Sequence, residues 1–166
     1  MTTGEKGINL IKNFESLHDG DLTQIGLQPK MDPIGIWTEG FGRAMKDDKG
    51  NFIKGSDKKQ LANSRITIHN EQEANLALKQ DLTVYERIVS QNIKITLNQN
   101  QFDSLVSYTY NTGGSDTLNK LINTKASEKN IRDWFINHYI IGENGQPLPG
   151  LIRRRKAEAD LYFTVI

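Results

Sequence analysis

Two carboxylates and a hydroxyl near the amino end of the chain have the residue types needed for acid and base chemistry on one bond. Glu15 lies at the edge of an apolar helical stripe, where burial should disfavour its ionised form, which suits a proton donor. Asp32 opens a polar turn and should stay ionised, which suits a carboxylate that holds or activates a water. Thr38 follows in the same hairpin and can bring its hydroxyl to the side of Asp32. The pattern predicts that an acid, a base and a hydroxyl converge.

Each of these residues also has a purely structural interpretation. The sequence Asp32-Pro33-Ile34-Gly35 suits a type I turn, and such a sequence is most often only a turn. A glutamate near a helix end is most often solvated. Spacing alone therefore leaves both interpretations open.

The elements expected to position these side chains fall into two groups. A helix over residues 7–18 carries Glu15, and residues 20–53 contain short β-forming pieces broken by turn sequences, which predict a small antiparallel sheet. The rest is predicted to be mostly helical. Helices are expected over residues 70–91 and from Asn98 to Gly113, and two more are expected to begin at Ser127 and near Pro149.

This order predicts an α+β fold in a single domain over residues 1–166. Its small antiparallel β lobe should occupy about residues 18–66. The larger helical lobe should occupy about residues 67–166 and include the N-terminal helix. An active-site cleft is expected between the lobes.

Composition restricts the chemistry available to the chain. Its 166 residues are 36% hydrophobic and 25% charged, a globular balance, and contain no cysteine. Thiolate metal sites and cysteine nucleophiles are therefore excluded. Three histidines, far apart in sequence, form no zinc-binding pair, so we expect no metal and no cofactor. A formal charge of +1 argues against nucleic acid as the main partner.

The first residues, MTTGEKGINLIKNFES, carry charges through a short apolar pattern and lack the apolar core of a signal peptide. No later stretch approaches the length of a membrane span, so no membrane insertion is expected. We expect a monomer that is synthesised in the cytoplasm of a bacterial host. If its target lies outside the cytoplasm, another agent must carry it there.

Three blocks of sequence resemble one known family. Phe14-Glu15 followed by DPIGIWTEGFGR resembles the signature of the phage-type lysozymes, the endolysins related to T-even phage lysozyme. The later blocks LNQNQFDSLVSYTYNTGG and GLIRRRKAEADLY resemble two further motifs of that family. They come in the family's order and extend over nearly the whole chain.

The resemblance implies roles for individual residues. It implies that Glu15 is the catalytic acid, that Asp32 manages the water, and that Thr38 is its hydroxyl partner. Asn111 matches a polar residue that lines the glycan cleft in relatives. Arg154, with the arginine after it, matches a pair of arginines in the family, although such a basic run can equally hold the last helix or neighbouring acids.

The chain departs from the family pattern at three places. Glu15 and Asp32 are 17 positions apart, about twice the usual separation, so HDGDLTQIGLQPK looks like an insertion at the mouth of the cleft. Glu39 replaces an aliphatic residue and is interpreted as a solvated strand residue, or else as a second acid. Arg43 replaces a frequent histidine. His18, inside the insertion, is interpreted as a surface or satisfied histidine rather than a catalyst.

The resemblance implies a muramidase that hydrolyses the β-1,4 bond between N-acetylmuramic acid and N-acetylglucosamine in peptidoglycan. An inverting mechanism is expected, with carboxyl groups roughly 6.5 to 9.5 Å apart. The enzyme would reach the wall through a holin-type pore or another delivery apparatus. Two alternatives are a lytic transglycosylase of similar architecture and a non-catalytic wall-binding protein. The joint presence of Glu15, Asp32 and Thr38 argues against a wall-binding protein. The pair of Asp32 and Thr38 argues against a transglycosylase, which uses one glutamate and no water.

Overall fold

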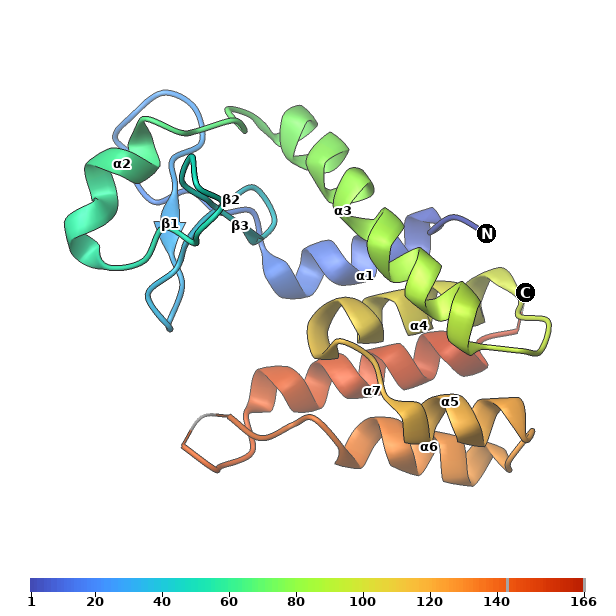
Figure 1. Cartoon of the computed structure of the whole chain (residues 1–166). Coiled ribbons are helices and arrows are strands. Elements are labelled where there is room, and N and C mark those ends of the chain that lie inside the picture. The colour runs from blue at the N-terminus through green and yellow to red at the C-terminus, as the bar shows by residue number, and fades with distance from the viewer. Residues whose placement is uncertain (143, 166) are drawn as a thin grey trace. The chain divides into compact units, whose positions relative to one another are not determined.

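A computed structural model describes residues 1–142 and 144–165, which group into two compact units (Figure 1). The first unit comprises Met1–Phe14 and Leu82–Ile166, and the second comprises Glu15–Asp81. Helix α1 (Glu5–Glu15) therefore ends where the second unit begins.

The second unit contains a small three-stranded antiparallel sheet. Its strands are β1 (Lys30–Met31), β2 (Trp37–Glu39) and β3 (Arg43–Ala44), in the order β1-β2-β3. Thr38 in the central strand pairs with Lys30 on one side and with Ala44 on the other. The prediction of a small antiparallel sheet is therefore confirmed, with Thr38 at its centre.

A compact apolar cluster supports this sheet. Trp37 on β2 packs with Met45, Ile53 and Ala62, all buried. Ala62 lies on helix α2 (Lys59–Asn63), which follows the short 3₁₀ helix η1 (Ser56–Lys58). The indole N–H of Trp37 donates to the carbonyl of Gly55 at 2.8 Å, so this large side chain is both buried and hydrogen-bonded.

The predicted ends of helix α3 (Glu71–Asn92) agree with the structure, whereas the predicted end of α1 does not. The Asn70 side chain caps α3 by accepting from the Glu73 amide at 2.9 Å. Helix α1 ends at Glu15 rather than at residue 18. Ser16 has φ of 60°, a left-handed conformation that stops the helix, so Glu15 is its last residue.

Helices make up the first unit beyond residue 82. Helices α4 (Gln99–Thr112), α6 (Glu128–Asn137) and α7 (Pro149–Phe163) were predicted. Their predicted caps are also present: Asn98 forms a capping box, Gly113 ends α4 in the left-handed conformation, and Ser127 caps α6. Helix α7 packs against α4 and α6 (Figure 1).

Helix α5 (Asp116–Asn123) was not predicted from the sequence. It is only eight residues long, and its apolar positions are few and separated by polar residues, so the helical periodicity is short. The signal was present, because Ser115 caps the helix and Leu118 and Ile122, which are buried, have helical spacing.

The α+β class predicted from the sequence is confirmed by the helices and the three-stranded sheet. Within residues 1–142 and 144–165, no helix combines the length and the apolarity needed to cross a bilayer.

Candidate active site

Thr38 lies in the central strand β2 with its hydroxyl held on two sides. The residue is only 4% exposed. Its hydroxyl donates to the carbonyl oxygen of Lys30 at 2.8 Å, and it lies 2.6 Å from Nδ1 of His18. The orientation of the hydroxyl is therefore fixed by the fold before any substrate binds.

Asp32 opens the turn between β1 and β2, and the backbone of that turn holds its carboxylate. The Oδ1 atom accepts hydrogen bonds from the amides of Ile34 at 3.0 Å and Ile36 at 2.8 Å. The amide of Gly35 donates to the carbonyl of Asp32 at 3.0 Å, so the predicted turn is present. Because Oδ1 is used by the turn, Oδ2 is the oxygen that remains for a water or a substrate.

Glu15 ends helix α1 with its carboxylate against the hairpin between β2 and β3. A Cβ atom added to Gly42 in that hairpin would lie 3.4 Å from Oε2 of Glu15. Gly42 also has φ of 85°, which L-residues with side chains rarely adopt. The glycine therefore allows the sharp turn and leaves room for the carboxylate of the half-buried Glu15.

His18 connects the helix end, the turn and the sheet. Its amide donates to the carbonyl of Gly40 at 2.7 Å, while its ring lies against the Thr38 hydroxyl. Burial of the ring lowers the pKa of His18 below its ordinary value, and the charge of Lys30 lowers it further. The charges of Glu15 and Asp32, together with the Glu15 backbone, act in the opposite direction.

The structure thus brings three of the predicted site residues into one region of the second unit. Glu15 lies against Gly42 in the hairpin that follows β2, and Asp32 opens the turn that precedes β2. The His18 ring contacts the Thr38 hydroxyl within β2. An acid, a second carboxylate and a fixed hydroxyl therefore belong to one small β-containing region, an arrangement suited to proton transfer at a polar bond.

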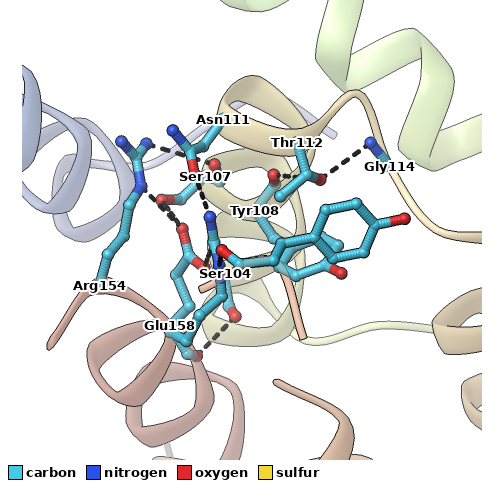
Figure 2. A network of polar contacts seen from close by, with 10 residues as sticks. Ser104, Ser107, Tyr108, Asn111, Thr112, Gly114, Arg154 and Glu158 are labelled. Carbon is cyan, nitrogen blue, oxygen red and sulfur yellow. Dashed lines mark hydrogen bonds and ion pairs between the residues drawn. The ribbon is translucent and has the colours of Figure 1, made fainter. Parts of the chain in front are cut away.

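The other two predicted site residues, Asn111 and Arg154, belong to a polar network in the first unit (Figure 2). Arg154 on α7 is 3% exposed, and its Nε donates to Oε1 of Glu158 at 3.1 Å. Its guanidinium also lies 5.6 Å from the ring centroid of Phe14. Asn111 at the end of α4 is exposed, and its Oδ1 accepts from Arg155.

Glu158 is the centre of this network. Its side chain is fully buried, and it accepts hydrogen bonds from both arginines and from the Ser107 hydroxyl, the last at 2.8 Å (Figure 2). Both arginine pairs lie within α7, and the links to α4 are the bonds from Ser107 to Glu158 and from Arg155 to Asn111. The network also orients the exposed Asn111 amide, because Arg155 donates to Oδ1 and the NH2 group must then point away from Arg155.

Comparison with known proteins identifies the family. Residues 22–158 match the family model described as phage lysozyme. The chain belongs to the phage lysozyme family. An endolysin of Acyrthosiphon pisum secondary endosymbiont phage 1 is 27% identical over 169 residues, covering 98% of each chain.

Solved structures agree with this membership. The chain is similar to a point mutant of P22 lysozyme, with a TM-score of 0.72 at 23% identity, covering 99% of each chain. It is also similar to the muramidase domain of SpmX from Asticaccaulis excentricus, with a TM-score of 0.71 at 27% identity and the same coverage. The predicted family and lysozyme-like fold are confirmed, and so is the prediction of a peptidoglycan-hydrolysing glycosidase.

Glu39 is buried, although the alternation of side chains along β2 predicts that it is exposed to solvent. It is 5% exposed, and its carboxylate accepts from the Thr67 amide at 2.8 Å, the Thr67 hydroxyl at 2.6 Å and the Ile68 amide at 3.1 Å. The prediction was wrong because β2 is buried on both of its faces, so alternation does not lead to solvent. Three donors compensate the burial of the charge.

A Glu39→Gln substitution should therefore reduce stability. The amide NH2 of glutamine would face backbone N–H donors that the carboxylate now satisfies, at a cost of about 2 kcal/mol. For a chain of this size the melting temperature should fall by roughly 4–8 °C. Thermal unfolding followed by circular dichroism measures this. Asp48→Asn, which removes an exposed partner of Arg65 in the same unit, is the control and should change stability by less than about 0.5 kcal/mol. Equal stability of the Gln variant and wild type would contradict the assigned bonds.

Arg43, which stands where the family often has histidine, ties β3 to α3. Its guanidinium forms a bidentate pair with Asp81, with both N–O distances 2.9 Å, and donates to the carbonyl of Ala77 at 2.7 Å. Planar bidentate pairing of this kind is what arginine offers and lysine does not. The departure therefore has a structural explanation within the second unit.

The insertion at residues 18–30 forms a closed surface loop. The amide of Gly20 donates to the carbonyl of Gln28 at 3.0 Å, which closes the loop, and the Leu27 amide donates to His69 at 2.9 Å. Its large apolar residues Leu22 and Ile25 are 86% and 101% exposed and add nothing to the core. The residue in the insertion that sequence analysis undervalued is His18, because only the fold shows its contact with Thr38.

Proposed function

We propose that this phage lysozyme cleaves the β-1,4 bond between N-acetylmuramic acid and N-acetylglucosamine by a single inverting displacement. The observation that supports this most directly is that Glu15, Asp32 and Thr38 belong to one compact unit, in which Lys30 and His18 fix the Thr38 hydroxyl. Two carboxylates on one glycosidic bond are the usual requirement for this reaction.

Each residue has a distinct part in the proposed reaction. Glu15 donates its proton to the glycosidic oxygen as the bond to the anomeric carbon breaks. Oδ2 of Asp32 accepts a proton from a water whose oxygen attacks that carbon from the opposite face. The Thr38 oxygen accepts a hydrogen bond from the other proton of this water. One water is consumed, and the sugar released at the new reducing end has the inverted configuration.

We further propose that Asn111 and Arg154 contribute to glycan binding in different ways. Asn111 is exposed and presents its amide NH2, a donor suited to the hydroxyl and acetamido oxygens of a sugar. Arg154 is almost completely buried, so it contributes chiefly by maintaining the network around Glu158 on which Asn111 depends.

The setting of the reaction follows from the family. An enzyme that hydrolyses peptidoglycan acts on the bacterial cell wall, as the name endolysin of its relative indicates. We propose that the chain functions as a monomeric single domain, with its β-containing lobe at about residues 18–66. We also propose that it is made in the host cytoplasm and reaches the wall through a holin-type pore or another delivery apparatus.

Digestion of purified peptidoglycan in H₂¹⁸O tests the reaction. The expected products are muropeptides with a free reducing N-acetylmuramic acid carrying one ¹⁸O at its anomeric carbon, detected by mass spectrometry. Proton NMR at early times should show the α anomer first, as inversion requires. A 1,6-anhydro product without label would instead identify a lytic transglycosylase. Binding without any cleavage would identify a wall-binding protein.

A further inference from the structure

His18 makes a contact with Thr38 that the reaction described above does not use. The ring nitrogen Nδ1 lies 2.6 Å from the Thr38 hydroxyl oxygen, a short and therefore strong hydrogen bond. The side chain comes from the insertion between Glu15 and Asp32, and its backbone is fixed to Gly40 at 2.7 Å. Both ends of the histidine are thus tied to the central hairpin of the second unit.

The direction of this hydrogen bond follows from the number of protons on the Thr38 hydroxyl. A hydroxyl has one proton and two acceptor lone pairs. That proton is donated to the carbonyl of Lys30, which can only accept. The proton between Thr38 and His18 must therefore come from Nδ1 of the imidazole. Burial lowers the pKa of His18, which favours the neutral ring, while the backbone of Glu15 acts in the opposite direction.

This arrangement determines what Thr38 can do toward a water. One lone pair of its oxygen accepts from His18, and its proton is bound to Lys30, so one lone pair remains. Thr38 can then only accept a hydrogen bond from the attacking water. A water that donates one proton to Thr38 and the other toward Asp32 has a lone pair directed away from both acceptors, as attack on carbon requires.

We propose that His18 is a positioning residue that makes Thr38 a fixed acceptor for the catalytic water. This inference rests on the proposed role of Thr38. The insertion at residues 18–30 would then contribute one residue, His18, to the positioning of the catalytic water.

Two nearly isosteric substitutions test the role of the hydrogen bond. Asn at position 18 can place an amide N–H where Nδ1–H now lies, whereas Leu of similar shape cannot. We expect His18→Leu to lower kcat on a soluble glycan of alternating N-acetylglucosamine and N-acetylmuramic acid by about 10- to 100-fold, with KM changed less than about threefold. His18→Asn should stay within about threefold of wild type in both. A folded His18→Asn variant with kcat reduced more than tenfold would overturn the proposal, whether or not the Leu variant folds.

A double-mutant comparison separates this inference from the proposed function. Thr38→Val should reduce kcat by about 100-fold or more, and adding His18→Leu to it should reduce kcat no further. If Thr38→Val is fully active, the proposed role of Thr38 fails. If Thr38→Val is inactive but His18→Leu is within twofold of wild type, only the inference on His18 fails. If the kcat of the double variant were reduced by the product of the two single losses, His18 would act independently of Thr38. That result would also overturn the inference on His18.

Nitrogen NMR provides a readout that does not depend on activity. In protein with ¹⁵N-labelled histidine at neutral pH, His18 should show a protonated Nδ1. An unprotonated Nδ1 would contradict the hydrogen bond from His18 to Thr38. For the kcat measurements on the His18 variants, the control is His69→Asn, because His69 contacts Glu73 rather than Thr38 and its replacement should leave kcat unchanged.

Discussion

A Glu15→Gln variant should fold like wild type and lose at least about 10²- to 10³-fold of its activity on cell walls. Glutamine preserves the shape of the side chain at the end of α1, but it has no acidic proton to give to the leaving oxygen. General acid catalysis contributes about 10²- to 10⁴-fold to reactions of this kind. The measurement is the rate of turbidity loss of a wall suspension, with the melting temperature as the check on folding.

Glu5→Gln is the matched control for this prediction. Glu5 lies in the first turn of the same helix and is exposed, so its substitution changes charge by the same amount without touching the proposed site. We expect it to keep full activity. If Glu15→Gln retained even a tenth of the wild-type rate while folding normally, the proton donor would have to be another group of the second unit.

The fold was predictable where local chemistry sets the boundaries of an element. Asn98 and Ser127 cap helices as their sequences predict, because the cap is made by the residue itself and by its near neighbours. The end of α1 was missed because a left-handed serine, Ser16, stops it, and serine carries no such signal in sequence.

The site was predictable only in part. The family motifs pointed to Glu15, Asp32 and Thr38, and the structure places them in one unit. Glu39 was misjudged because its partners come from a segment about thirty residues later, which no local pattern reveals. His18 was undervalued for the same reason, since its partner Thr38 lies twenty residues away. Contacts of this range depend on how the strands pair.

The largest expected effect on stability is that of Glu158→Ala. The substitution leaves the guanidinium groups of Arg154 and Arg155 buried beside each other without their shared carboxylate. Removing one partner from such a buried cluster costs about 3–5 kcal/mol. The melting temperature should therefore fall by roughly 6–20 °C. Calorimetry at neutral pH measures this. The control is Glu128→Ala, which removes an exposed partner of Arg132 and should cost less than about 0.5 kcal/mol.

A triple variant, Arg154→Met, Arg155→Met and Glu158→Leu, distinguishes loss of hydrogen bonds from burial of two positive charges without their shared carboxylate. Apolar side chains of similar volume can replace a buried ionic cluster with little loss of stability, or even a gain. We therefore expect the triple variant to be more stable than Glu158→Ala. It should still bind glycan more weakly than wild type, because Asn111 loses the donor from Arg155 that fixes its amide. If the triple variant were the less stable of the two, the cost would lie in lost hydrogen bonds between α4 and α7 and not in the buried guanidinium charges.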